Sequence, residues 1–220
     1  MADILNRITS LLYPRRCVIC QELVEYNSLF CGKCSYTQAD VTQVRSKINW
    51  EGIADVAVPY EYGPGISGAI LAMKRYRDSR ATDYYADKIA AMLSDCNCDI
   101  VIPVPMSGRE KRKRGYNHAG VLAEALGGKL GVPFESGLLS RKDGTVLQRS
   151  LDRGDRFENA QKSYAPGKDF MLAEGKHILL VDDVLTTGAT IIACCLCLKS
   201  SGAERVSVAA ICSTNEKELP

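Results

Sequence analysis

The chain has 220 residues, of which 46% are hydrophobic and 25% are charged. This composition excludes wholesale disorder, and the length suits one well-buried core with a small accessory module. The formal net charge of +2 points to no partner by itself, although basic residues cluster at 109–114 and again between 141 and 156. Such clusters are typical of anion or nucleic-acid sites and equally of solvated surfaces.

The N-terminal segment predicts an amphipathic helix, because its apolar residues recur at helical spacing. These residues are Ile4, Leu5, Ile8, Leu11 and Leu12. Asp3 and Arg7 interrupt the apolar run, so we expect no secretory signal, and no apolar run is long enough to span a membrane. We therefore expect a cytoplasmic protein whose ten cysteines serve as thiols or metal ligands.

Two CxxC pairs follow, with ten residues between them. They consist of Cys17, Cys20, Cys31 and Cys34. Each CxxC turn can place two sulfurs about 2.3 Å from one ion, and two such turns complete the closed tetrahedral site of a structural zinc. We expect Zn²⁺ here, within a module spanning residues 1–50, and redox-active thiols are the alternative.

Aromatic and basic side chains are interleaved around these cysteines. They are Tyr13, Arg15, Arg16, Tyr26, Phe30, Lys33 and Tyr36. Two interpretations stay open: contacts with a single-stranded nucleic acid, or the small core of the module.

The remaining residues, 51–220, alternate strand and helix patterns, which predicts an α/β fold with a mostly parallel, doubly wound sheet. In chain order the pattern gives an extended segment before a Gly/Pro turn at 63–65, helices between about 66 and 94, a strand over 99–105, a loop over 106–109, a helix over 118–130, a strand over 178–181, a helix over 189–201 and a strand over 205–212. The polar stretch from Gly137 to Lys162 is long enough to be a functional lid or a disordered segment.

Six further cysteines lie outside the CxxC pairs. Cys194, Cys195, Cys197 and Cys212 fall in apolar segments, where free cysteine behaves as a small buried hydrophobe. Cys96 and Cys98 form a CxC pair before a predicted strand. That spacing is compatible with a metal, but no neighbouring His or Cys pair in the sequence supports one.

The most informative stretch is ILLVDDVLTTGAT, in which Asp182 and Asp183 follow an apolar strand. Ligands of open α/β sheets bind at the carboxyl ends of the strands, and carboxylates accept hydrogen bonds from ribose hydroxyls. The next residues offer backbone N–H groups and hydroxyls at a helix N-terminus, which suits an anion. They are Thr186, Thr187, Gly188, Ala189 and Thr190. The order predicts a ribose 5-phosphate site, and the alternative is a strand end followed by an ordinary helix cap.

This stretch resembles the 5-phosphoribosyl 1-pyrophosphate (PRPP) loop of type I phosphoribosyltransferases. The wider order of CxxC/CxxC, KRYRDSR, IPVP, RGYNH, QRSLDRGDRFEN and VDDVLTTGAT resembles the ComF family of competence-associated, phosphoribosyltransferase-like proteins over nearly the whole chain. The resemblance implies a type I phosphoribosyltransferase-like fold at 51–220, with a hood over 51–98 and the core sheet over 99–220. It also implies a four-cysteine zinc module at the N-terminus.

The resemblance also implies roles for individual residues. Asp182 and Asp183 would hold the ribose hydroxyls of PRPP, and residues 186–190 would bind its 5-phosphate. Met106, Ser107 and Arg109 would belong to the pyrophosphate loop, Lys74 and Arg77 to the hood, and residues from about Arg141 to Asn159 to a flexible loop. Mg²⁺ would bridge the ribose hydroxyls and the pyrophosphate. RGYNH departs from the commonest family form, which has Phe and Gln in place of Tyr116 and His118.

We expect a ComF-like protein that binds PRPP with magnesium, transfers the phosphoribosyl group to an unidentified acceptor, and handles single-stranded DNA during natural transformation. The transformation role, with competence or helicase proteins as partners, comes from the resemblance. Two alternatives are a non-catalytic adaptor for single-stranded DNA with a relic or sensor PRPP site, and a nucleobase salvage enzyme. Arg109 and the acid pair would carry catalysis, because neither His118 nor His177 has a sequence neighbour that marks a general base.

Overall fold

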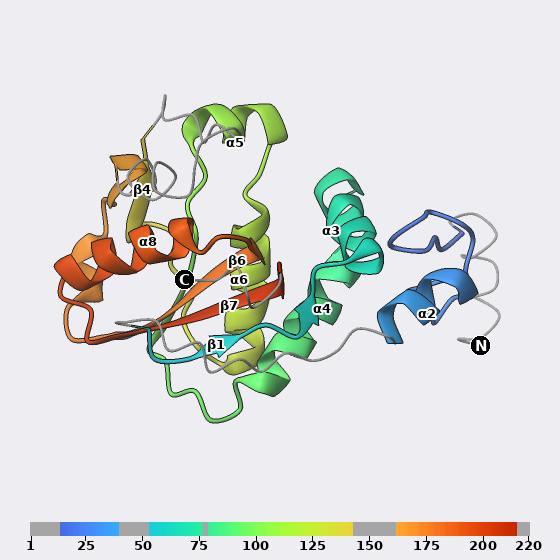
Figure 1. Ribbon diagram of the computed structural model, residues 1–220, viewed down its shortest axis with the longest axis horizontal. Coiled ribbons are helices and arrows are strands. Elements are labelled where there is room, and N and C mark those ends of the chain that lie inside the picture. Colours follow the sequence, from blue (N-terminus) through green and yellow to red (C-terminus); the bar gives the residue numbers. More distant parts are fainter. Residues whose placement is uncertain (1–13, 40–52, 77–78, 143–161, 215–220) are drawn as a thin grey trace, which may run out of the picture.

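The computed structural model describes residues 14–39, 53–76, 79–142 and 162–214 (Figure 1). Its centre is a parallel sheet in which β6 lies between β7 and β3, while β1 and β2 both pair with the far edge of β7. The strands are β1 (Val56–Ala57), β2 (Tyr60–Glu61), β3 (Ile100–Pro103), β6 (His177–Leu185) and β7 (Arg205–Ser213). The expected parallel sheet is confirmed.

Helices cover both faces of this sheet. α4 (Ser79–Met92) and α6 (His118–Leu130) lie on one face, and α8 (Ala189–Ser200) lies on the other (Figure 1). Alternate residues of β6 serve the two layers: Ile178 and Leu180 pack under α8, whereas Leu179 and Val181 pack against α4 and α6. A strand buried on both faces reads as a continuous apolar run, which is why this strand was visible in the sequence.

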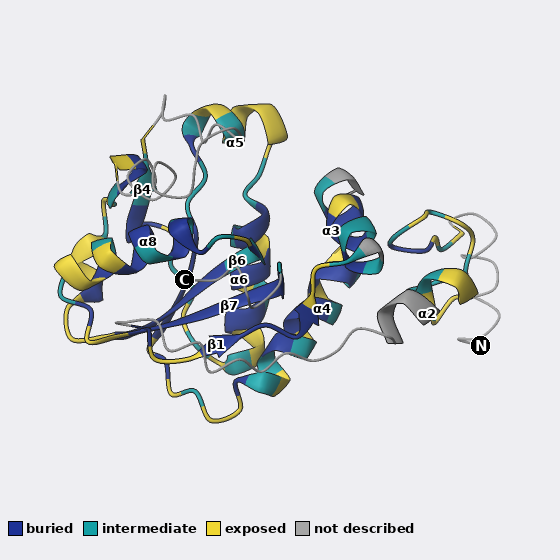
Figure 2. Cartoon of the chain, in the orientation of Figure 1, coloured by how far each residue is buried: buried dark blue, intermediate teal, exposed yellow. Residues whose placement is uncertain are grey.

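Smaller elements complete the described residues. They are α2 (Gly32–Ala39), α3 (Pro64–Tyr76), α5 (Gly108–Arg114), the antiparallel pair β4 (Leu139–Arg141) and β5 (Tyr164–Pro166), and the 3-10 helix η1 (Phe170–Ala173). The sequence predicted neither α5 nor β4. α5 forms because Ser107 and Glu110 make a capping box, which satisfies N–H groups at the start of the helix. It buries no side chain, and Figure 2 shows it as a largely exposed projection.

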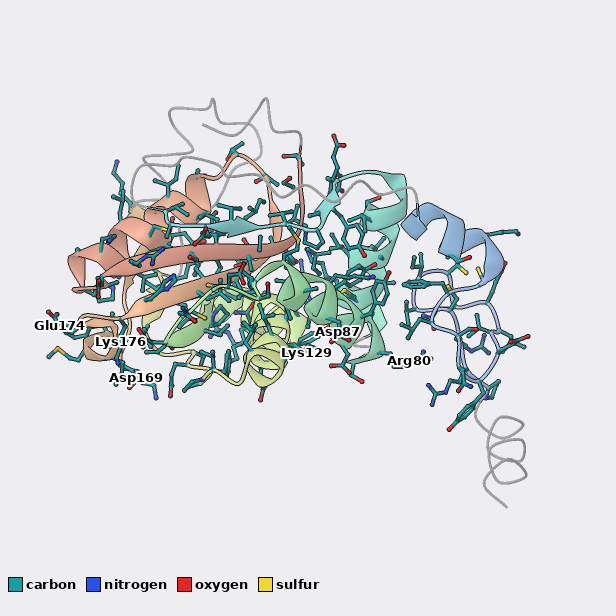
Figure 3. All side chains as sticks on the ribbon, turned by 90° about the horizontal axis from the view of Figure 1, so that it is seen from below. Arg80, Asp87, Lys129, Asp169, Glu174 and Lys176 are labelled. Carbon is teal, nitrogen blue, oxygen red and sulfur yellow. The ribbon has the colours of Figure 1, made fainter. Side chains whose placement is uncertain are left out.

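The cysteine module packs on the helices α3 and α4, beside the sheet rather than over it (Figure 1). Val18 is 1% exposed and belongs to the same apolar core as these helices. The Phe30 ring meets the Tyr84 ring edge-on at 5.2 Å between centroids. Arg80, which faces the module in Figure 3, donates to the Arg16 carbonyl at 3.0 Å. The module is therefore a packed part of the molecule.

Three expectations fall on residues that lie outside the described ranges. These are the helix expected near residues 4–12, the hood residue Arg77, and the segment 143–161 of the expected flexible loop. Among the described residues, no helix combines the length and the apolar character that crossing a membrane requires.

Candidate phosphoribosyl site

The acid pair lies where β6 runs past the end of its neighbour β3. The ladder between the two strands ends at Pro103 and Val181, and Pro105 then offers no N–H group. β6 itself continues to Leu185, because β7 still pairs with it there. The sequence placed Asp182 after the strand, whereas the structure places it within the strand. From Asp182 onward, one edge of β6 is thus left open toward a cleft.

The cleft at this edge holds about 550 Å³ of empty space, its open mouth included. Its polar and charged lining residues are Lys74, Glu110, Arg114, Asn117, His118, Arg141, Tyr164, Asp182, Asp183 and Thr190. These side chains come from α3, α5, α6, both strands of the small sheet, β6 and α8. The cleft is therefore assembled from segments distant in the sequence.

The acid pair has an unusual electrostatic setting. Lys74 Nζ lies 2.5 Å from Asp183 Oδ2, and the Asp183 N–H donates to Asp182 Oδ1 at 2.8 Å. Burial, together with the negative charge of Asp183, raises the pKa of Asp182 to about 8. Near neutral pH the Asp182 carboxyl is thus largely protonated, and it can both donate and accept hydrogen bonds. Such a pair suits the two hydroxyls of a ribose.

The TTGAT turn prepares the N-terminus of α8. Gly188 precedes the helix with φ of 74°, a left-handed conformation that glycine adopts without the strain a side chain brings. No side chain caps the helix, so its first N–H groups are left for a ligand or solvent. Thr190, in the first turn, lines the cleft and hydrogen-bonds with Tyr164. This end of α8 is the part of the cleft that suits a phosphate.

The structure brings together five of the expected site residues. Those that line the cleft are Lys74, Met106, Asp182, Asp183 and Thr190. The residues Thr186, Thr187, Gly188 and Ala189 are not among the lining residues. Ser107 is buried and caps α5, while Arg109 lies exposed on α5 and does not line the cleft.

The RGYNH segment ties α3 to the loops of the cleft. Gly115 ends α5 with φ of 82°, and the Tyr116 hydroxyl then donates to the Met73 carbonyl at 2.9 Å. Asn117 donates from Nδ2 to the Val104 carbonyl, also at 2.9 Å. Because Met73 precedes Lys74, the tyrosine fixes the helix that presents this lysine. Residues 116–118 were noticed in the sequence only as a family motif.

An ion pair that the sequence analysis missed joins α5 to β4. Arg141 Nη1 lies 2.7 Å from Glu110 Oε2, and the Arg141 side chain is only 11% exposed. The same carboxylate oxygen accepts weaker hydrogen bonds from Ser107. The Arg141 Nε is buried and has no hydrogen-bond partner among the described residues. An arginine that lines a cleft and has an N–H group without a partner among the described residues suits an anionic ligand.

The four cysteines of the module converge on one point. Their sulfurs all lie within 4.8 Å of one another, and Cys20 Sγ is 3.6 Å from Cys31 Sγ. Four sulfurs around one zinc at about 2.3 Å lie about 3.8 Å apart in a tetrahedron, so the group could hold a structural zinc. Of the aromatic residues nearby, Phe30 packs on Tyr84, while Tyr26 lies at the surface beneath Arg15. The side chains of Tyr13 and Tyr36 lie outside the described residues.

Residues 112–220 match the model of the phosphoribosyl transferase domain. "Competence protein F" of Haemophilus influenzae is 31% identical over 110 residues, which are 50% of this chain and 48% of that protein. "Competence protein ComFC" of Bacillus subtilis is 30% identical over 65% of this chain and 57% of that protein. The matched domain and these two relatives support a ComF-type, phosphoribosyltransferase-like protein.

Other relatives extend the ComF-type match along the chain. "DNA utilization protein YhgH" of Escherichia coli is 24% identical over 90% of this chain and 84% of that protein. Among solved structures, adenine phosphoribosyltransferase from Thermoanaerobacter pseudethanolicus is 18% identical over 80% of this chain and 86% of that chain, with a TM-score of 0.44. The expected fold, a type I phosphoribosyltransferase-like sheet with an N-terminal cluster of four cysteines, is confirmed by the matched domain and the sheet topology.

Proposed function

We propose that this ComF-family chain binds PRPP together with Mg²⁺ in the cleft beside β6. The observation that carries the proposal is the meeting of the acid pair, the first turn of α8 and three cationic side chains in one cleft. We propose the division into residues 1–50 and 51–220 as the zinc module and the phosphoribosyltransferase-like domain.

Each part of PRPP has a matching part of the cleft. The ribose hydroxyls face Asp182 and Asp183, and the 5-phosphate lies at the first turn of α8 near Thr190. The pyrophosphate lies toward Arg141, whose planar guanidinium suits phosphate oxygens. When bound with PRPP, Mg²⁺ supplies positive charge to the pyrophosphate oxygens. The open cleft fits that ion, because Mg²⁺ keeps several water and phosphate oxygens as ligands.

Calorimetry with PRPP and Mg²⁺ tests the proposal. Each carboxyl contributes hydrogen bonds of a kind worth about 1.5–3 kcal/mol, so we expect Asp183→Asn to weaken binding by about 10- to 100-fold. The double variant Asp182→Asn with Asp183→Asn should abolish measurable binding.

Asp87→Asn is the matched control, because it makes the same chemical change on α4, outside the cleft. Asp87 pairs with Lys129 on α6 at 2.5 Å, and both are labelled in Figure 3. PRPP affinity should match that of the unchanged protein. Absence of PRPP binding in the unchanged protein, or equal affinity in the double variant, would contradict the proposed site.

A second function, binding of single-stranded DNA, is favoured by α5. This helix buries no side chain and carries five basic residues, Arg109, Lys111, Arg112, Lys113 and Arg114. Phosphate contacts of this kind make affinity fall steeply as salt rises. The names of the relatives, which refer to competence and DNA utilization, also favour a function that involves DNA.

Fluorescence anisotropy with a labelled single-stranded oligonucleotide tests this second function. Lys111→Gln with Lys113→Gln should weaken binding and flatten its salt dependence, because two phosphate contacts are lost. Lys88→Gln with Lys199→Gln, which removes two lysines from α4 and α8, is the matched control. An affinity that changes neither with the salt concentration nor with the α5 substitutions would exclude a DNA role for this helix.

The acceptor distinguishes a phosphoribosyltransferase from a PRPP sensor. Release of pyrophosphate from PRPP should be screened with purines, pyrimidines, amines and single-stranded DNA. Turnover with a free nucleobase alone would favour the salvage function, whereas binding without turnover would favour the sensor. Competence proteins and helicases are the partners that we propose for the ComF-type role.

A further inference from the structure

A pair of thiols lies near the amino-terminal ends of the strands, at the opposite end of the sheet from the cleft. Cys96 and Cys98 precede β3 and thus sit at the amino-terminal ends of the parallel strands. Their sulfurs are in hydrogen-bonding contact with each other. Cys98 is 8% exposed, while Cys96 is half-buried and reachable from solvent. The pair therefore combines an accessible thiol with a screened one.

A buried histidine and a serine adjoin the accessible thiol. Cys96 hydrogen-bonds with Ser207, and Ser207 Oγ lies 2.9 Å from His177 Nε2. His177 Nδ1 lies 3.0 Å from the Asn97 carbonyl oxygen, which can only accept. We therefore assign the imidazole proton to Nδ1, which leaves Nε2 to accept from Ser207. When Cys96 ionises, the Ser207 hydroxyl can donate to its thiolate, which favours the ionised form of Cys96.

The other groups facing Cys96 are the charges of Asp55 and Arg205. These two lie 3.8 Å apart and largely oppose each other. The hydrogen bond from Cys98 lowers the pKa of Cys96 to about 7, against the effect of burial. By contrast, burial raises the pKa of Cys194 and of Cys195. Cys96 thus differs from the thiols of α8 in exposure, partners and charge state.

We propose that Cys96 and Cys98 form a redox-active dithiol that closes to a disulfide in the presence of a small-molecule disulfide. The Cys96 thiolate attacks one sulfur of that disulfide, forms a mixed disulfide and releases one thiolate. Cys98 then attacks the Cys96 sulfur, forms the Cys96–Cys98 bond and releases the second thiolate, which takes up the Cys98 proton. The protein loses two electrons and two protons, and the small disulfide is reduced to two thiols.

The test is mass mapping of the full chain, purified with zinc, after incubation with oxidised glutathione at pH 7. We expect the peptide containing Cys96 and Cys98 to lose two hydrogens. In Cys98→Ser the glutathione should instead remain on Cys96, because the second attack is missing. Absence of both products would overturn the proposal, as would closure onto any other cysteine.

Alkylation kinetics test the role of the serine in the intact fold. Ser207→Ala should slow the reaction of Cys96 with iodoacetamide at pH 7 by about twofold, because one hydrogen bond that favours the thiolate is lost while the larger effect of Cys98 remains. Ser94→Ala, on the exposed turn before Cys96, is the matched control and should leave the rate unchanged. Equal rates in Ser207→Ala and the unchanged protein would exclude a role for Ser207 in the reactivity of Cys96.

Discussion

At the scale of single residues, the cleft depends on two carboxyls, Asp182 and Asp183, and the pKa of Asp182 is raised. Asp182 and Asp183 are adjacent on β6, and Lys74 forms an ion pair with Asp183. Their mutual repulsion and partial burial favour one proton on the pair at neutral pH. Without a ligand, this arrangement lowers the free energy of unfolding. Two carboxyls exposed to solvent would both ionise without this electrostatic penalty.

The first prediction concerns the pH dependence of stability. The pKa of Asp182 is about 8 in the folded chain and 3.8 in its ordinary setting, so between these values the folded state holds a proton that the unfolded state releases. The free energy of unfolding should therefore fall as pH rises from about 4 to about 8. Asp182→Asn should remove this part of the slope. Urea unfolding at pH 5 and pH 8 measures it, and an identical slope in both proteins would refute the assignment.

The second prediction concerns the hydroxyl of Tyr116. Tyr116→Phe removes the hydrogen bond to the Met73 carbonyl and should lower the free energy of unfolding by about 1 kcal/mol. It should also weaken PRPP binding, because Met73 adjoins Lys74. Tyr62→Phe, which removes the hydroxyl of a tyrosine exposed on the surface, is the control for chemical denaturation and calorimetry. If Tyr116→Phe and Tyr62→Phe have the same free energy of unfolding and the same PRPP affinity, α3 does not depend on the hydrogen bond from Tyr116.

At the scale of elements, the cysteine module is joined to α3, which carries Lys74, and to α4. Val18 contributes to their core, and Phe30 packs edge-on against Tyr84. Gly68 on α3 allows this approach, since a Cβ there would lie 3.3 Å from Ile19 Cγ2. The module is too small to fold around a core of its own, so we propose that a metal on the four cysteines orders it together with this contact.

The third prediction concerns removal of the zinc. Cys20→Ser, or treatment with a strong chelator, should unfold the module and expose the side chains of α3 and α4 that it covers. We expect a lower melting temperature and earlier proteolytic cleavage within residues 14–39. Cys197→Ser replaces a cysteine outside the module, on α8, and should change neither. A chain that melts identically with and without metal would contradict a structural zinc.

The central strands could be predicted because each is buried on both faces and therefore appears as an apolar run. α5 could not, because five of its seven residues are basic and only the capping box marks its start. β4 could not either, since its three residues are defined by pairing with β5, more than twenty residues later. Local sequence patterns thus predict the strands that are buried along their whole length. They miss elements that depend on a cap or on pairing with a distant strand.

At the scale of the whole molecule, the cleft is a product of the topology. The acid pair and the end of α8 were predictable from one continuous motif, since both follow β6 directly. The ion pair between Glu110 and Arg141 was not, because 31 residues separate the two and no local pattern links them. The family resemblance assigned Arg109 to the pyrophosphate loop; in the structure Arg109 lies exposed on α5, and Arg114 of the same helix lines the cleft.

The most direct test of the proposed PRPP site is a crystal structure of the full chain with PRPP and Mg²⁺. The proposal predicts the ribose hydroxyls against Asp182 and Asp183, the 5-phosphate at the first turn of α8, and the pyrophosphate within reach of Arg141. An empty cleft under saturating PRPP, or PRPP bound only along α5, would contradict it.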